Sequence, residues 1–415
     1  MKKIIFLFTA LIAFTIVAFN IISTPKTVLN FLNWGEYIDT ELVKKFEEEF
    51  DCQVNEEDVT SSEAMYQKIS SKTTAYDVAI PGDYVVKQMY EEKLLREIDV
   101  NNPKYTNLYG ESGNLYKTMF TDSLQELIDK NFKDSKTNEV YDSYFMPYFW
   151  GAYSIIYSTR KDDVEEVVKN NGFKAIFDRS LYKEDVKIGV YDTSRWDVAI
   201  YLLSKGINPN VTDPFDLSTT GDISKSLQDE IVNVIKNSNF DEWGNDSLKR
   251  DTANGTIDLC FTQLGDFFDA LYLTYDSGVS EINFNVSVPT STAAFFDAMV
   301  IPTTCEQYDL ANEFINFMMD PENAYSNAQA IGYCPTLKEV VNSYEADALD
   351  PESYYFISED ESVSLSTKDF LEKYPMYLNP LYGMTKEQID NIYLLDPKST
   401  SYLTTCESII NRAKN

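Results

Sequence analysis

Residues 28–50, VLNFLNWGEYIDTELVKKFEEEF, decide the fold, because they place a buried strand directly before an amphipathic helix. The run Val28–Trp34 is mostly apolar, which is typical of a strand covered on both faces. Asp39 or Thr40 can then cap a helix. Its apolar positions recur at helical spacing and are Leu42, Val43, Phe46 and Phe50. A strand followed by a helix in this way predicts a sheet covered by helices.

The same alternation continues on both sides of this stretch. Strands are expected at 54–59 and 76–80, and helices from Ser61 or Ser62 onward and over 84–94. A second set of strands begins beyond Gly151, with strands at 186–191, 257–261 and 295–301 and helices at 196–203, 267–273 and 310–318. The first of these units predicts a largely parallel sheet covered by helices. Two α/β units in one chain predict two lobes with a cleft between them, and ligands are expected near the carboxyl ends of the strands.

Composition narrows the range of functions. The 415 residues hold 67 acidic and 35 basic side chains, a net charge of −32. Such a surface disfavours nucleic acid, which needs clustered cations, and concentrates small cations, although solubility alone is an alternative reason for the charge. The sequence has no histidine. Nucleophilic sites that use histidine and imidazole metal sites are therefore excluded.

The spacing of the cysteines does not indicate a metal-binding or redox motif. The five cysteines are far apart and form no C-x-x-C pair; they are Cys52, Cys260, Cys305, Cys334 and Cys406. A zinc or thioredoxin-like motif is excluded, and buried thiols are the expected state. We expect no metal and no cofactor.

The amino terminus indicates the compartment. Lys2 and Lys3 precede an uncharged run over residues 4–25. Residues 1–26 are therefore expected to be a signal peptide or, if uncleaved, an amino-terminal membrane anchor. Either way the rest of the chain would lie outside the cytoplasm.

Aromatic and acidic residues follow several predicted strands. The strand exits read NWGEY from Asn33, PGDY from Pro81, DTSRWD from Asp192 and FFDA from Phe295. An amine ligand needs such groups, since ammonium groups bind carboxylates and ring faces, and methylenes pack on rings. For any one aromatic, core packing is an equal alternative. For a lone acidic residue, a solvated face or a helix cap is the alternative.

Four stretches resemble the spermidine/putrescine-binding proteins of ABC importers. They are NFLNWGEYIDTELVKKFEEEF, AYDVAIPGDYVVKQM, MPYFWGAYSIIYS and FFDAMVIP, with ANEFINFMMDPENA and AIGYCPT after the last. The matches run in the family's order from about residue 28 to 337. The resemblance implies a two-lobed, periplasmic-binding-protein-like (type II solute-binding) α/β fold with a ligand cleft between the lobes.

The resemblance also implies a set of ligand-contacting residues. Trp34, Tyr37, Tyr84 and Tyr333 match aromatic contacts, and Asp297 matches an acidic position that holds an amine. The family's usual Trp is replaced here by Phe295, which keeps a ring face.

Other positions depart from the family. Thr193 and Trp196 stand where the family has an Asp and a Glu, although a shift of one residue would place Asp192 or Asp197 there. Gln263 stands at a further Trp position. The losses favour a shorter diamine, a differently placed charge or another amine.

The resemblance further implies the chain's organisation and role. One lobe would comprise residues 27–150 plus 295–340, and the other 151–294 plus 341–415. The protein would be a monomer without enzymatic activity that binds a polyamine extracytoplasmically and docks on a membrane permease. Its energy would come from a separate ATPase, since the chain has no phosphate-binding loop. A receptor for thiamine or iron, an exported hydrolase using two carboxylates, and a sensor or adhesin remain alternatives.

Overall fold

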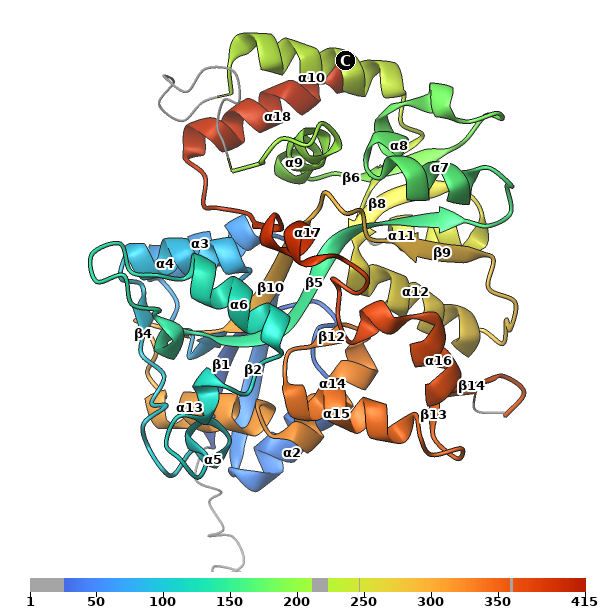
Figure 1. Ribbon diagram of the computed structural model, residues 1–415. Coiled ribbons are helices and arrows are strands. Elements are labelled where there is room, and N and C mark those ends of the chain that lie inside the picture. Colours follow the sequence, from blue (N-terminus) through green and yellow to red (C-terminus); the bar gives the residue numbers. More distant parts are fainter. Residues whose placement is uncertain (1–25, 211–222, 246, 359–360) are drawn as a thin grey trace, which may run out of the picture.

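A computed structural model describes residues 26–210, 223–245, 247–358 and 361–415 (Figure 1). Of the predicted signal or anchor segment, residues 1–25 lie outside these ranges, and only Lys26 is described. None of the helices in them has the length and apolarity needed to cross a bilayer.

The first unit has the predicted order of strands and helices. Its elements are β1 (Thr27–Trp34), α2 (Thr40–Glu49), β2 (Cys52–Val59), α3 (Ser62–Ser71), β3 (Val78–Ala79) and α4 (Asp83–Glu91). Asp39 and Ser61 cap α2 and α3 by accepting backbone N–H groups of Glu41 and Ala64. β1 lies between β2 and β3 and is parallel to both. These strand ends therefore meet at one edge, at Trp34 and Pro81.

The second sheet is mixed, in the order β15-β10-β5-β8-β6-β7, with β9 and β12 also paired to β5. Its strands are β5 (Met146–Ser158), β6 (Ile188–Tyr191), β7 (Glu242–Gly244), β8 (Leu259–Gln263), β9 (Phe284–Ser287), β10 (Ala293–Met299), β12 (Cys334–Pro335) and β15 (Tyr393–Leu394). β5 is antiparallel to β8, β9, β10 and β12. The expectation of a largely parallel sheet, made for the first unit, is confirmed there. The second sheet is mixed because the long strand β5, which was not predicted as a strand, runs antiparallel to its neighbours.

Helices cover this sheet and extend the first unit. Those of the middle of the chain are α5 (Thr106–Tyr109), α6 (Asp122–Asn131), α7 (Val164–Asn171), α8 (Lys174–Phe177), α9 (Ser194–Ser204), α10 (Lys225–Ser238), α11 (Ser247–Asn254) and α12 (Leu264–Asp276). Later ones are α13 (Tyr308–Met318), α14 (Pro321–Ile331), α15 (Lys338–Asp347), α16 (Thr367–Lys373), α17 (Lys386–Asp390) and α18 (Thr400–Lys414). Short strands β4 (Leu95–Arg96) with β11 (Ile301–Pro302), and β13 (Tyr354–Ile357) with β14 (Ser364–Ser366), form two small ladders.

Two groups of elements lie above and below in Figure 1, with β5 and β10 running between them. The lower group contains β1, β2 and α2 to α6, and the upper group contains β6 and α7 to α10. All thirteen residues of β5 are buried. This long strand and its partner β10 therefore connect the two groups.

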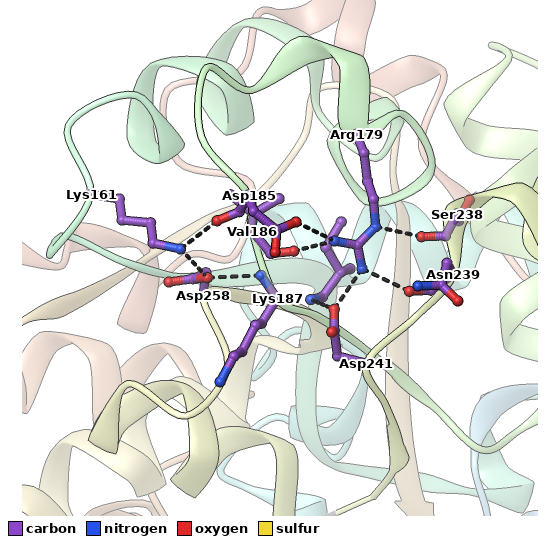
Figure 2. A network of polar contacts seen from close by, with 10 residues as sticks. Lys161, Arg179, Asp185, Val186, Lys187, Ser238, Asn239, Asp241 and Asp258 are labelled. Atoms are coloured by element: carbon purple, nitrogen blue, oxygen red, sulfur yellow. Dashed lines mark hydrogen bonds and ion pairs between the residues drawn. The ribbon is translucent and has the colours of Figure 1, made fainter.

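A polar network fixes the start of β6 in the upper group (Figure 2). The Arg179 guanidinium donates to the carbonyl oxygens of Val186, Ser238 and Asn239 and forms an ion pair with Asp241, with Nη2 2.5 Å from Oδ2. The same Asp241 oxygen accepts the Ile188 N–H at 2.9 Å. One side chain thus ties the end of α10 to the first residue of β6, which leads to the DTSRWD turn.

The last residues return across both groups. β15 pairs in parallel with β10, and α18 packs against α9 and α10 at the top of Figure 1. The Lys130 ammonium of α6, in the lower group, donates to the carbonyl oxygen of Asp390 at 2.8 Å. The carboxyl-terminal segment therefore touches both groups of elements. All five cysteines are free and buried, which confirms the expectation of buried thiols.

Candidate ligand-binding site

The strand ends bring Tyr37, Asp83 and Asp297 to one place. The Tyr37 hydroxyl, just beyond β1, donates to Asp297 Oδ2 of β10 at 2.8 Å. Gly82 forms a backbone bridge with Asp297, and the Ala298 N–H donates to the Pro81 carbonyl oxygen at 3.0 Å. The side chain that begins α4, Asp83, therefore lies next to the segment that carries Asp297.

Both carboxyl groups have a raised pKa. Burial raises the pKa of Asp297 from 3.8 to about 7, against the opposing effect of the Tyr37 hydrogen bond. Burial also raises the pKa of Asp83 to about 7, with a further contribution from the Asp297 charge. The positive charges of Lys87 and Arg195 act in the opposite direction on Asp83. A cation placed between these two acids would stabilise their ionised forms.

Asp83 was not among the predicted site residues. It is 2% exposed, its Oδ1 accepts the Tyr84 N–H at 2.7 Å, and its Oδ2 has no hydrogen-bond partner among the described residues. A buried carboxylate oxygen without a donor is costly, so Asp83 lacks a partner that a ligand can supply.

Aromatic rings pack around this pair of carboxyl groups. The Phe295 ring stacks on that of Tyr153 of β5, with centroids 5.9 Å apart. Gly151 of β5 makes room for it, since a Cβ atom there would lie 2.7 Å from Phe295 Cζ. The Tyr333 ring is perpendicular to that of Tyr37 at 5.2 Å. The rings supply the flat apolar surface that methylene groups need.

Tyr333 and Gln263 meet across the start of α12. The Tyr333 hydroxyl donates to Gln263 Oε1 at 3.3 Å and to Asp266 Oδ1 at 3.4 Å. Gln263 and Asp266 also form the capping box of α12. A Cβ atom at Gly265 would lie 2.3 Å from Tyr333 Cε2, so the glycine permits this contact. Gln263 thus positions Tyr333.

Trp34 has a mainly structural contact. Its indole Nε1 donates to the Ile80 carbonyl oxygen at 2.8 Å, and the ring is partly buried against the core. This bond fixes the end of β1 to the residue that precedes Pro81. The Tyr84 hydroxyl, in α4, donates to Glu63 at 3.2 Å.

The DTSRWD turn places its residues in different surroundings. Thr193 is the N-cap of α9, without a side-chain cap bond. Trp196 packs between Tyr153 and Tyr191, with centroids 5.8 and 5.4 Å away. Asp192 is half-exposed and forms an ion pair with Lys414 of α18. The structure thus directs Asp192 to the carboxyl-terminal helix rather than to the carboxylate pair.

Asp197 is buried within α9. Burial raises its pKa well above the ordinary value, and its two oxygens lack a hydrogen-bond donor within the described part of the chain. The charges of Lys414 and Asp192 act on it in opposite directions, lowering and raising its pKa. Its surroundings are therefore those of α18.

Arg195 and Asp396 were missed by the sequence analysis. Arg195 is 6% exposed, and its Cζ atom lies 3.7 Å from the centroid of the Tyr84 ring. Its Nη2 donates to the Asp396 carbonyl oxygen at 2.6 Å. The Asp396 carboxylate in turn lies 3.0 Å from Lys87 Nζ. The position of Arg195 in DTSRWD was a signal available in the sequence, whereas nothing local marked Asp396.

The described ranges contain no cluster of three or more Cys, Asp or Glu side chains that could hold a metal ion. The cluster combines two acids, ring faces and a tyrosine hydroxyl, groups that are suited to binding a cation. The fold and this cluster define a two-lobed solute-binding protein. The chain belongs to the family of bacterial extracellular solute-binding proteins, whose model matches residues 41–351.

Known proteins agree with this class. The chain is 25% identical over 315 residues to the spermidine/putrescine-binding periplasmic protein of Salmonella typhimurium, covering 75% of this chain and 78% of that one. It is 24% identical to the putrescine-binding periplasmic protein PotF of Escherichia coli, over 74% and 77% of the two chains. The solved structure of the spermidine/putrescine ABC transporter substrate-binding protein PotD from Streptococcus pneumoniae matches with a TM-score of 0.61 and 26% identity, over 94% and 98%. The resemblance and fold class inferred from the sequence are confirmed.

Proposed function

We propose that this protein is the extracytoplasmic substrate-binding subunit of an ABC importer and that it captures a polyamine between its lobes. One observation carries the proposal. Asp83 and Asp297, both with a pKa of about 7, lie together beside the rings of Tyr84, Phe295 and Tyr333.

The chemistry of the site fits a polyamine. An ammonium group that leaves water needs a carboxylate, and the methylene chain between ammonium groups needs apolar rings. The net charge of −32 draws such cations toward the surface. The printed names of the relatives, which bind spermidine and putrescine, support the same ligand class.

Binding would proceed by closure of the lobes. One lobe comprises residues 27–150 plus 295–340 and the other 151–294 plus 341–415, with β5 and β10 crossing between them. The ammonium groups of the ligand enter the open cleft, both acids release their remaining protons to solvent, and the rings of Phe295 and Tyr333 close on the methylene groups. The closed monomer then docks on a membrane permease served by a separate ATPase, without chemistry of its own. The segment 1–26 directs or anchors it outside the cytoplasm.

Calorimetric titration of the purified full-length protein tests this proposal. The ligands are putrescine, spermidine, spermine, thiamine and ferric citrate, and a screen with chromogenic glycosides checks for hydrolysis. One-to-one binding of a polyamine, with none of thiamine or iron and no hydrolysis, is the expected result. No heat from any polyamine, with protein that unfolds cooperatively on heating, would refute the proposal.

A further inference from the structure

The carboxyl-terminal segment contacts helices of both proposed lobes, although it lies beyond residues 41–351 of the family match. Its helix α16 lies beside α12 at the right of Figure 1, whereas α4 lies at the left. α12 is part of residues 151–294 and α14 is part of residues 295–340, which the proposed lobes place on opposite sides of the cleft. A segment that holds these two helices together limits how the lobes can move apart.

Tyr377 joins α14 to α12. It ends the short 3-10 helix η4 (Pro375–Tyr377). Its hydroxyl donates to the carbonyl oxygen of Ala328 of α14 at 3.0 Å and lies 3.0 Å from the hydroxyl of Tyr344 of α15. Its ring is edge-on to that of Phe268 of α12, with centroids 4.9 Å apart. One fully buried side chain thus contacts a helix of each lobe.

Two further rings extend this contact along α12. The ring of Tyr374 lies 5.1 Å from that of Phe267, and the ring of Phe370 lies 5.8 Å from that of Phe268, measured between centroids. All of these side chains are at most 1% exposed. Phe370, Tyr374 and Tyr377 are called the aromatic brace below.

The end of α14 also contacts α12 directly. A Cβ atom at Gly332 would lie 3.5 Å from the backbone nitrogen of Asp269, and the Tyr333 hydroxyl donates to Gln263 Oε1 at 3.3 Å. Moving α14 away from α12 would expose buried rings to water and open voids in a closely packed region, and both effects cost free energy. This side of the molecule is therefore expected to stay closed.

The contacts between the lobes on the other side are polar. The Arg195 guanidinium of α9 lies over the Tyr84 ring of α4, with Cζ 3.7 Å from the centroid. Asp396 accepts from Lys87 Nζ at its carboxylate, at 3.0 Å, and from Arg195 Nη2 at its carbonyl oxygen, at 2.6 Å. The side chain of Asp396 is 50% exposed. Water can replace the partners of a half-exposed carboxylate at little cost, whereas it cannot replace ring packing.

Resting on the lobe closure proposed above, we propose that the aromatic brace is the fixed pivot of this motion. The lobes separate only at the opposite edge, which is formed by Tyr84, Arg195 and Asp396 and is called the opening edge. The strands β5 and β10 take up the rotation, and the ligand enters at the opening edge. The carboxyl-terminal segment therefore sets the direction in which the protein opens.

Distances between spin labels, measured by pulsed electron paramagnetic resonance on the full-length protein, test this proposal. One doubly labelled protein carries Glu91→Cys in α4 and Thr404→Cys in α18, which packs against α9 and α10, and reports on the opening edge. The other carries Glu322→Cys in α14 and Asp276→Cys in α12 and reports on the brace. All four positions are exposed, and the five natural cysteines are buried, so wild-type protein treated with the label is the blank.

The two pairs are expected to behave differently. In the free protein the distance distribution of the opening-edge pair should be broader than that of the brace pair. Putrescine should shorten and narrow the opening-edge distances and leave the brace distances unchanged. A brace distribution as broad as that of the opening edge, or one that shifts as much with putrescine, would overturn the inference.

A substitution in the brace adds a second test. Tyr377→Ala removes the contacts with both helices and should broaden the distribution of the brace pair; Tyr377→Leu, which keeps apolar volume, replaces it if that variant does not fold. Tyr382→Ala is the matched control, because Tyr382 lies in the same segment and is 62% exposed. A brace distribution that Tyr377→Ala leaves unchanged, or that Tyr382→Ala broadens equally, would show that the aromatic brace is not the pivot.

The outcomes separate this inference from the proposed function. Polyamine binding by calorimetry together with movement at the brace pair would overturn the pivot alone. Folded protein that binds no polyamine would overturn the proposed function, and the two distributions of the free protein would still decide whether the brace is the fixed side.

Discussion

Replacing Asp297 by Asn is expected to weaken amine binding strongly and to leave the fold intact. The amide keeps an oxygen that can accept the Tyr37 hydroxyl, now 2.8 Å from Oδ2, and nearly keeps the volume of the carboxyl group. What it loses is the negative charge. The substitution therefore tests the charge of this residue separately from its packing.

The size of the effect follows from the surroundings. Truncating one partner of a buried charge pair costs about 2–5 kcal/mol, and Asp297 is only partly buried, so the lower half of that range applies. A loss of about 2–3 kcal/mol is a rise in the dissociation constant of roughly 30- to 150-fold. The free variant is expected to be at least as stable as the wild type at pH 8, because an ionised acid with a raised pKa disfavours the folded state.

Calorimetric titration with putrescine and thermal unfolding of the free protein measure the two effects. Asp122→Asn is the matched control, since the side chain of Asp122 is 94% exposed and lies outside the site formed by Tyr37, Asp83 and Asp297. It changes the net charge equally, and its affinity should be that of the wild type. Unchanged affinity in Asp297→Asn, or an equal loss in the control, would refute the placement of an ammonium group at this acid.

Further predictions concern pH, Arg179 and Gly151. Because burial raises the pKa of both cleft acids to about 7, affinity should fall up to about a hundredfold from pH 8 to pH 6 if both must ionise, and binding at pH 7 should release protons. The same groups make the free energy of unfolding of the free protein decline as pH rises from about 4 to 7. Titrations in buffers of different ionisation enthalpy measure the proton release on binding, and binding heats that do not depend on the buffer would contradict that release. Arg179→Ala should lower the free energy of unfolding, measured by urea denaturation, by about 2–4 kcal/mol, because it removes the network of Figure 2. The control Lys44→Ala removes an exposed ion pair and should cost less than about 0.5 kcal/mol. Equal losses in the two variants would show that the network does not stabilise the fold. Gly151→Ala should displace the Phe295 ring and weaken binding, since the new Cβ would lie 2.7 Å from it; titration as tight as the wild type would remove this ring from the site.

The first unit was predictable because its signals are local. The apolar run Val28–Trp34, the cap at Asp39 and the helical spacing of Leu42 and Phe46 agree with one another, and the structure confirms β1 and α2. The helix predicted over 310–318 is confirmed as α13, which ends at Met318, and Asp320 then caps α14.

The longest strand escaped prediction as a strand. MPYFWGAYSIIYS, which forms β5, was assigned only as a segment of family resemblance. A strand buried on both faces has no alternation of apolar and polar residues, and Pro147 and Gly151 read locally as interruptions. Its antiparallel pairing with β10 depends on tertiary contacts, so the mixed sheet could not be derived from local patterns.

The site was half predictable. Family resemblance located Tyr37 and Asp297, which the structure brings into contact. Asp83 was passed over because an acid in the first turn of a helix is ordinary, and only folding shows it to be buried. Asp396 meets Arg195 across 201 residues and carries no local signal at all.

The bonds of the cleft join very distant parts of the sequence. Tyr37 and Asp297 are 260 residues apart, and Lys87 and Asp396 are 309 apart. Forming a long-range contact costs loop-closure entropy before the contact contributes to the stability of the fold. Such contacts therefore tend to form late in folding. The cleft is therefore expected to be absent from the folding transition state. A bound amine should therefore slow the unfolding of the native protein and leave its folding rate unchanged. The ligand would then stabilise the native state kinetically and take no part in the folding reaction.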